Sequence, residues 1–378
     1  MFRKLLLATI LVPSAVFGST VPEIVDSVRR ADCPDRRVAI FNVDAVESED
    51  GWVLQGKVSE PGFKADLFRA LDRNGIKYRD GIAQLSTDRW GQVRIPVACM
   101  RVEPGHEQEM ASQAIMGMPL RILEIVDGDY RVQTPDGYIG YMPSSSLVEK
   151  TADEMKAWRS APRLVVTALD QVDVYSTKKP QGPRDIVTDV VNGSVLEGSL
   201  DGKEKMVHVA LPDGREGWIR RSDVTEISQW ASQPFDPEVI LNMAYSLNGT
   251  PYLWGGTSAK TLDCSGLAKV SYLANGRILS RDASQQALTG TRMAPEQWRE
   301  LQSGDLLFFG NPKTGKVTHV AIYDRDGEYI HSSGRVKVNS IDPSAADYLT
   351  TPHLSSTRIA GNENTPGIWL AKDHPWYF

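Results

Sequence analysis

One of the three cysteines stands in a setting that suits nucleophilic chemistry. The stretch "PYLWGGTSAKTLDCSGL", residues 251–267, places Cys264 between an aspartate and a serine. The preceding pair, Gly255 and Gly256, carries no side chains, which would let a substrate backbone approach the thiol. An inert buried thiol is the alternative, because an isolated cysteine often behaves as a small hydrophobic residue. Cys264 is the candidate nucleophile.

Cys264 is predicted to begin a helix. Apolar residues recur at intervals of three between positions 267 and 273, and the Asn-Gly pair at 275–276 is typical of a helix C-terminus. Thr261 or Asp263 can cap the start. Unpaired N–H groups and the helix dipole in a first turn lower a thiol pKa from about 8.5 toward roughly 3.5–7.5. A thiolate is therefore expected at this position.

The candidate base comes from the stretch "KVTHVAIYDRDGEYIHSSG", residues 316–334, which alternates as two strands and carries His319 and His331. A two-residue turn would place the histidines on opposite faces of the hairpin. A three-residue loop at 325–327, with Gly327 left-handed, places them diagonally on one face. We expect this loop. His319 would then take the thiol proton, and His331 would hold the other ring nitrogen of His319.

Composition narrows the remaining function classes. The formal net charge of −6 and the absence of a basic run argue against nucleic acid as a partner. No closely spaced Cys and His ligands indicate a metal site, and no cofactor is expected. A bridge between Cys33 and Cys99 and a pair of buried thiols are both compatible with the sequence, whereas Cys264 lies far from either.

The first residues, "MFRKLLLATILVPSAVFGS", combine an early positive charge, a short apolar run and small residues. This order is typical of a signal peptide, expected over 1–18, and the apolar run is too short to span a bilayer. No later segment has the roughly 20 apolar residues of a membrane helix. The mature protein is expected to be soluble and outside the cytoplasm, either secreted or periplasmic.

Two segments share the same turn chemistry. "TPDGYIGYM" (134–142) and "LPDGREGWI" (211–219) each join Pro-Asp-Gly to aromatic and aliphatic strand residues, and each follows short alternating runs. They predict two small all-β barrels at 96–150 and 163–228, which resemble bacterial SH3-like domains. A chance pair of hairpins is the alternative. A short N-terminal α/β segment (19–95) would precede them, built from a hairpin around residues 47–51 and the helix "KADLFRALDRNG".

The last domain, 236–378, opens with the helical pattern "EVILNMAYSLNG". Within it, "PYLWGG", "DCSGL", "LQSGDLLFF", "THVAIY" and "YIHSSG" resemble, in this order, the motifs of NlpC-type cell-wall cysteine peptidases. The resemblance covers about residues 236–345 and implies an α+β papain-like fold. The whole chain is then a multidomain protein, with two SH3-like barrels ahead of the peptidase. That architecture is similar to γ-D-glutamyl-L-diamino acid endopeptidases, which trim peptidoglycan stem peptides.

The resemblance also implies roles for individual residues. It implies a Cys264–His319–His331 triad and places Tyr252 at the oxyanion site, beside the backbone N–H of Cys264. Ala283 departs from the family, where a serine is common, which puts one hydrogen bond to substrate in doubt. The remaining positions it assigns to substrate binding are Asp263, Ser265 and Asp282 in the peptidase domain, and Glu103 and Tyr138 in the first SH3-like domain.

Glu103 and Tyr138 match positions that hold the free amine of the L-Ala at the start of the stem peptide, which suits wall recycling. The expected activity is therefore hydrolysis of the γ-D-glutamyl bond to diaminopimelate or lysine. An acyltransferase or amidase using the same Cys–His pair is one alternative. A non-catalytic wall-binding protein that relies on its SH3-like domains is another.

Overall fold

The computed structural model describes residues 20–363 and 365–378, which divide into two compact units, one ending at Thr87 and the other running from Asp88 to Phe378. The signal sequence expected over 1–18 lies outside the described residues. No helix in the described ranges is long and apolar enough to cross a bilayer.

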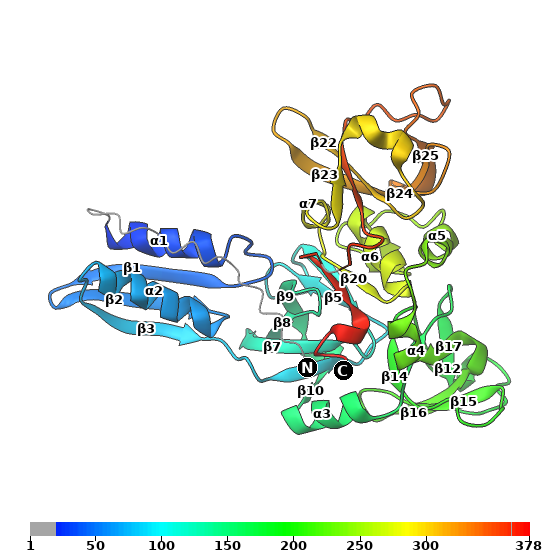
Figure 1. Ribbon diagram of the computed structural model, residues 1–378. Coiled ribbons are helices and arrows are strands. Elements are labelled where there is room, and N and C mark those ends of the chain that lie inside the picture. Colours follow the sequence, from blue (N-terminus) through cyan, green and yellow to red (C-terminus); the bar gives the residue numbers. More distant parts are fainter. Residues whose placement is uncertain (1–19, 364) are drawn as a thin grey trace, which may run out of the picture. The chain divides into compact units, whose positions relative to one another are not determined.

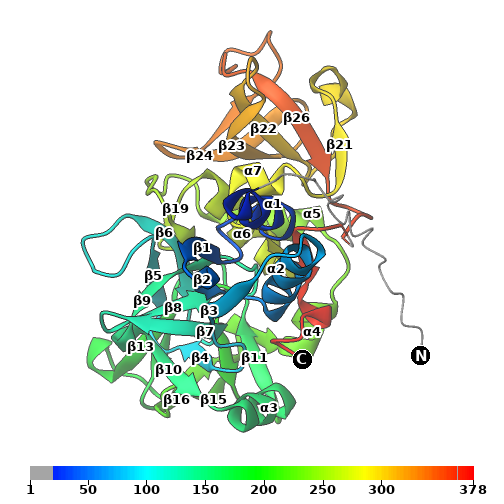
Figure 2. The ribbon, with the colours of Figure 1, turned by 90° about the vertical axis from the view of Figure 1, so that its left-hand side faces the viewer.

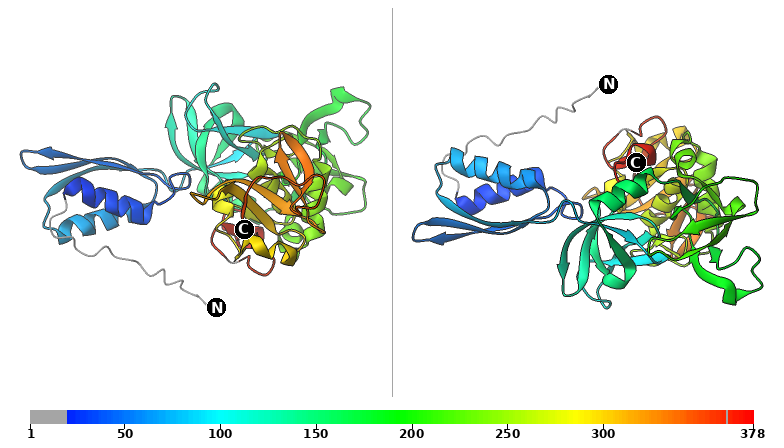
Figure 3. Two further views of the ribbon diagram at one scale, coloured as in Figure 1. Left: turned by 90° about the horizontal axis from the view of Figure 1, so that it is seen from above. Right: turned by 90° about the horizontal axis from the view of Figure 1, so that it is seen from below.

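The first unit is a three-stranded sheet with two helices on one face, side by side (Figure 1, Figure 3). β1 and β2 form the antiparallel hairpin expected from the acidic turn, whereas β3 pairs with β2 in parallel. The sequence pattern missed α1 and β3, and α2 begins at Pro61, before the expected Lys64. The elements are α1 (Val21–Asp32), β1 (Phe41–Ser48), β2 (Gly51–Val58), α2 (Pro61–Arg73) and β3 (Tyr78–Gln84).

The second unit begins with a seven-stranded antiparallel sheet whose spatial order is β10-β4-β7-β8-β9-β5-β6. It starts at Trp90, before the expected boundary at 96, because Trp90–Val93 pairs with β10 and β7. Its strands are β4 (Trp90–Val93), β5 (Val97–Arg101), β6 (Met110–Ile115), β7 (Pro119–Val126), β8 (Asp129–Gln133), β9 (Ile139–Pro143) and β10 (Leu147–Lys150).

After α3 (Ala152–Ser160), a second seven-stranded sheet repeats this topology strand for strand, in the order β17-β11-β14-β15-β16-β12-β13. The two Pro-Asp-Gly segments occupy equivalent turns, and Gly137 and Gly214 both have φ of 84°. Only glycine adopts this conformation without steric cost. The strands are β11 (Arg163–Val166), β12 (Val172–Tyr175), β13 (Ile186–Val190), β14 (Val195–Glu197), β15 (Met206–Ala210), β16 (Glu216–Arg220) and β17 (Val224–Glu226).

The rest of the unit packs helices against a six-stranded sheet of order β21-β26-β22-β23-β24-β25. Figure 2 shows α6 and α7 next to this sheet, and both contact β23. The helices are α4 (Ile227–Ser232), α5 (Pro237–Ser246), α6 (Cys264–Ala274) and α7 (Ala283–Gln286). The sheet contains β21 (Thr291–Met293), β22 (Leu306–Asn311), β23 (Lys316–Tyr323), β24 (Glu328–Ser333), β25 (Arg335–Ser340) and β26 (His353–Arg358).

Two short ribbons complete this part of the chain. They are β18 (Thr257–Ser258) with β19 (Thr261–Leu262), and β20 (Arg277–Leu279) with β27 (Ile368–Leu370). The C-terminal residues then leave the six-stranded sheet. His374 Nε2 donates to the carbonyl of Pro135, 2.9 Å away, and Arg163 donates to the carbonyl of Tyr377 at 2.7 Å. The end of the chain thus contacts residues of both seven-stranded sheets.

Candidate active site

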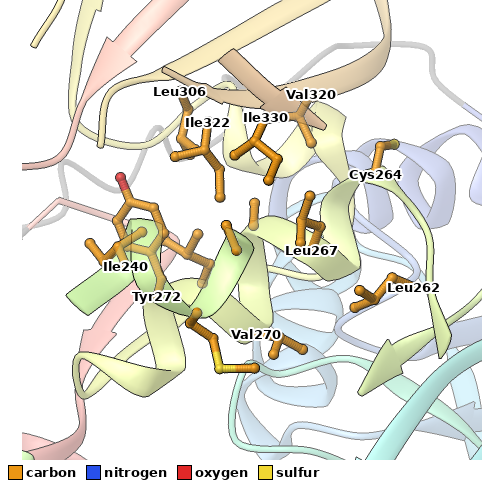
Figure 4. Packing of buried hydrophobic residues seen from close by; sticks show 14 of the residues in the cluster. Ile240, Leu262, Cys264, Leu267, Val270, Tyr272, Leu306, Val320, Ile322 and Ile330 are labelled. Carbon is orange, nitrogen blue, oxygen red and sulfur yellow. The ribbon is translucent and has the colours of Figure 1, made fainter. Parts of the chain in front are cut away.

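Cys264 is the first residue of α6, as its sequence context predicts. Asp263 is the N-cap and accepts a hydrogen bond from Gly266 N at 2.7 Å, so it, and not Thr261, caps the helix. The helix ends at Ala274, and Gly276 takes the positive φ of 69° that its C-terminus requires. Apolar residues of α6 pack under the sheet, where Figure 4 shows Cys264 beside Val320 at the edge of the hydrophobic cluster.

The thiol environment differs from the expectation of a low pKa. Burial raises the pKa of the Cys264 thiol to about 11, and the nearby Asp263 carboxylate adds to the rise. Backbone N–H groups of Val320 and Ser265 donate toward the sulfur and offset only part of this. The thiolate prediction was wrong because the helix start already holds a carboxylate and the side chain is removed from water. At neutral pH the Cys264 side chain is therefore a neutral thiol.

The hairpin that carries both histidines has the predicted register. Asp324 N donates to the carbonyl of Glu328, and Ile322 pairs with Ile330. The turn itself differs in one respect: Asp326 and Gly327 both have positive φ, at 52° and 88°. The register is that of a three-residue loop, because Arg325 precedes these two residues between Asp324 and Glu328. β23 and β24 pair only as far as Ile322 and Ile330, so the strands separate where the thiol contacts the peptide between His319 and Val320.

His319 and His331 lie in contact beyond the end of that ladder. Nε2 of His319 is 2.7 Å from Nδ1 of His331, and the rings meet edge to face. Nε2 of His331 is in turn 2.9 Å from Oδ1 of Asn339 on β25. The Asn339 amide donates to the backbone carbonyl of Asp347 at 2.7 Å. A continuous line of hydrogen bonds therefore leads from the loop after β25 to His319.

Both rings are neutral at physiological pH. Burial lowers the pKa of His319 to about 3, with further lowering from His331 and Lys337. Burial also lowers the pKa of His331 to about 4. The hydrogen bond to Asn339 raises this pKa, and the Lys337 ammonium lowers it further. Lys337 lies directly across the β24–β25 ladder from His331. A neutral imidazole can accept the thiol proton, as a general base must.

Asp263 and Ser265, both predicted to bind substrate, are buried beside a residue that the sequence did not single out. Arg281 makes a bidentate contact with the Asp263 carboxylate, and its Nη1 also donates to Ser265 Oγ at 2.9 Å. Gly255 N donates to the same carboxylate at 3.0 Å. The planar fork of Arg281 gives the buried Asp263 carboxylate the cationic partner that such a group needs.

Tyr252 lies next to the thiol. Burial raises the pKa of its phenol to about 12, with Cys264 and Asp263 contributing further, so the hydroxyl remains a hydrogen-bond donor at neutral pH. The neighbouring glycines, Gly255 and Gly256, are required by packing within the protein, a different reason from the substrate access expected from the sequence. A side chain on Gly255 would meet the carbonyl of Met110 on β6, and one on Gly256 would meet the backbone of residues 261–262. Both glycines allow close approach within the protein itself.

The first seven-stranded sheet reaches the site through the turn that precedes β9 and through strand β6. Tyr138, in the Pro-Asp-Gly turn, lies near enough to Arg281 to influence its pKa. Gln113 of β6 accepts hydrogen bonds from Thr257 N at 2.9 Å and Ser258 Oγ at 2.9 Å. Glu103 lies on an exposed bend between β5 and β6, and its side chain forms no hydrogen bond or ion pair with the described residues.

The remaining predicted positions lie next to Arg281 in the sequence. Asp282 is the N-cap of α7, with Oδ1 3.9 Å from Arg281 Nη1, and Ala283 is the buried first residue of that helix. Arg281 was missed because an arginine preceding a cap has no distinctive spacing. For Asn339 the sequence held only a weak indication, because strand alternation in residues 335–340 puts it on the same face as Lys337.

All three cysteines are free thiols.

Comparisons with known proteins agree with this geometry. The NlpC/P60 family matches residues 249–356, and the bacterial dipeptidyl-peptidase Sh3 domain matches residues 100–147. Dipeptidyl-peptidase 6 of Lysinibacillus sphaericus is 30% identical over 266 residues, covering 65% of this chain and 89% of that protein. A gamma-D-glutamyl-L-lysine dipeptidyl-peptidase of Bacillus cereus is 27% identical over 236 residues, covering 59% of this chain and 67% of that protein.

Among solved structures, an NlpC/P60 family protein from Bacillus cereus ATCC 10987 is similar with a TM-score of 0.61 and 21% identity. The match covers 72% of this chain and 99% of that one, and it shows a shared fold. Together with the free thiol at the start of α6 and the paired histidines, these similarities identify the chain as a member of the NlpC/P60 family of cysteine peptidases, with an SH3 domain ahead of the peptidase domain.

Proposed function

We propose that the protein hydrolyses the γ-D-glutamyl bond to an L-diamino acid in peptidoglycan stem peptides that have a free N-terminal L-Ala. The observation that carries the proposal is the contact of the thiol with the peptide before Val320, next to the His319–His331 pair at 2.7 Å. The names of the two relatives, a dipeptidyl-peptidase and a gamma-D-glutamyl-L-lysine dipeptidyl-peptidase, support this substrate class.

The chemistry begins with a neutral pair. As Sγ of Cys264 attacks the γ-carbonyl carbon, its proton passes to the free Nδ1 of His319, and the carbonyl π electrons move to oxygen. The Cys264 N–H and the Tyr252 hydroxyl donate to that oxyanion. When the C–N bond breaks, His319 returns the proton to the leaving amine. Water then attacks the thioester, with His319 again taking a proton, and the acid is released while the thiol re-forms.

The free amine of L-Ala needs a carboxylate near the cleft. Asp263 is paired with Arg281, and Asp282 also lies within 3.9 Å of that guanidinium, whereas Glu103 is exposed on the bend between β5 and β6. A cationic amine held by a carboxylate in a closed pocket gains roughly 2–5 kcal/mol over an amine whose partner is removed. We assign Glu103 to this contact, because it lies on the loop that leads to Met110 and so to Gly255.

We further infer that the second seven-stranded sheet is a second SH3-like barrel, because its strand order and its Pro-Asp-Gly turn repeat those of the first. The signal-like residues 1–18 and the wall substrate support action outside the cytoplasm, in the periplasm or secreted.

The test compares L-Ala-γ-D-Glu-diaminopimelate, its lysine counterpart and an N-acetylated form of each, with products identified by mass spectrometry. We expect cleavage of the γ-D-glutamyl bond, at least about 30-fold faster for free than for acetylated peptides, since losing a buried charge pair costs at least about 2 kcal/mol. Equal turnover of both forms would refute the free-amine requirement. Cys264→Ala should abolish cleavage. A product joined to an added amine would instead indicate the acyltransferase.

A further inference from the structure

The polarity of the hydrogen bonds around His331 is set by a backbone carbonyl outside the histidine pair. The carbonyl of Asp347 can only accept, so the Asn339 group 2.7 Å from it is the NH₂. The amide oxygen of Asn339 therefore faces His331, and Nε2 of His331, at 2.9 Å, must carry a hydrogen. A neutral His331 then has a lone pair on Nδ1.

The same reasoning continues to His319. Since Nδ1 of His331 is an acceptor, Nε2 of His319, 2.7 Å away, must be the donor. Nδ1 of His319 is then left without a hydrogen. This is the nitrogen that remains to accept the thiol proton. Asn339 is buried at 9% exposure, and no other hydrogen bond is available to Nε2 of His331 among the described residues.

We propose that Asn339, held by the Asp347 carbonyl, is a positioning residue that fixes both histidines as Nε2–H tautomers and so keeps His319 able to deprotonate Cys264. Without it, His331 could carry its hydrogen on Nδ1, which would force the hydrogen of His319 onto Nδ1, the nitrogen proposed to take the thiol proton. The inference rests on the proposed catalytic roles of Cys264 and His319, but it is independent of which peptide is cut.

Two variants separate positioning from structural support. Asn339→Leu removes both hydrogen bonds with little change in size. Asn339→Asp also loses the donor to Asp347 but keeps an acceptor for His331. A purely structural role of the Asp347 contact would impair both variants alike. In the positioning role, Asn339→Asp regains activity at alkaline pH, because its carboxylate raises the pKa of His331 and only the neutral His331 is productive.

The experiment measures kcat/KM against pH, the alkylation rate of Cys264 by iodoacetamide, and the imidazole ¹⁵N shifts in full-length protein. Peptide mass spectrometry follows Cys264 alone, so Cys33 and Cys99 do not contribute. We expect Asn339→Leu to lose about 10–100-fold in kcat/KM at every pH, the size of effect seen when the hydrogen-bond partner that orients a metal-bound imidazole is removed, and to show the Nδ1–H form of His319. Asn339→Asp should approach the wild-type kcat/KM at pH values above the raised pKa of its His331.

The proposal is overturned if wild-type His319 carries hydrogen on Nδ1, or if Asn339→Leu alters neither tautomers nor rates. It is also overturned if the two variants lose activity equally at all pH values while the tautomers stay unchanged. A wrong substrate assignment would appear differently: the tautomers and the alkylation rates would follow the proposal while no γ-D-glutamyl peptide was cleaved.

Discussion

Nζ of Lys269 lies 2.6 Å from Oδ2 of Asp136, and this ion pair joins α6 to the Pro-Asp-Gly turn of the first seven-stranded sheet. Both side chains are almost fully buried, at 10% and 1% exposure. The helix that begins with Cys264 is thus held against the SH3 domain by an ion pair with little access to water. Tyr138, which lies two residues beyond Asp136, is positioned beside Arg281 by the same turn.

Lys269→Met should destabilise the second unit by about 3–5 kcal/mol, because the carboxylate of Asp136 would stay buried without its cation. Urea unfolding measures the change. Adding Asp136→Asn should recover part of the loss. The matched control is Lys178→Met, which breaks an exposed pair with Glu204 of similar length, 2.7 Å, and should cost at most about 1 kcal/mol. Equal effects of the two single variants would contradict the buried-pair account.

Alkylation of Cys264 should rise about tenfold per pH unit between pH 7 and 10, because only the thiolate reacts and the thiol pKa is near 11. The rate constant with iodoacetamide, followed on the peptide that contains Cys264, tests this. A plateau between pH 6 and 8 would instead indicate a thiolate–imidazolium pair in the resting protein, and would restore the expectation from the sequence.

Lys337→Met should raise the pKa of both histidines, because its ammonium opposes their protonation. The acid limb of kcat/KM would move to higher pH. The pKa of each histidine in the folded protein lies below its unfolded value of about 6.5, so the free energy of unfolding is fully retained above that pH and falls as the pH is lowered. In Lys337→Met the pKa values are depressed less, so the free energy of unfolding falls less steeply with decreasing pH. NMR titration of the imidazole protons measures both shifts. Lys316→Met on β23, which influences neither ring, should leave them unchanged.

Gly255→Ala should destabilise the protein more than Gly249→Ala. The two glycines have similar φ, 82° and 90°, so both variants carry the left-handed strain of about 1–2 kcal/mol. A side chain at Gly249 meets open space, whereas one at Gly255 would stand 2.5 Å from the Met110 carbonyl. The difference, about 1–3 kcal/mol by unfolding, measures that close approach. Equal losses would mean that the contact with β6 is easily displaced.

The local features of the site can be predicted from the amino-acid sequence alone. The Asn-Gly end of α6 and the hairpin register depend on a few neighbouring residues and were predicted correctly, and the helix cap was narrowed to Thr261 or Asp263, of which Asp263 is the N-cap. The paired Pro-Asp-Gly turns are local in the same sense. Such features can be predicted because turn and cap chemistry restricts the backbone within four or five residues.

The electrostatics of the site, and the contacts that surround the two histidines, follow from the tertiary structure. Whether Cys264 rests as a thiol depends on burial and on Asp263, whose charge is balanced by Arg281 from a distant turn. The link from His331 through Asn339 to the Asp347 carbonyl likewise joins segments that no spacing rule connects. A pKa and a tautomer are set by everything within a few ångströms, and in a folded chain those neighbours come from many places in the sequence.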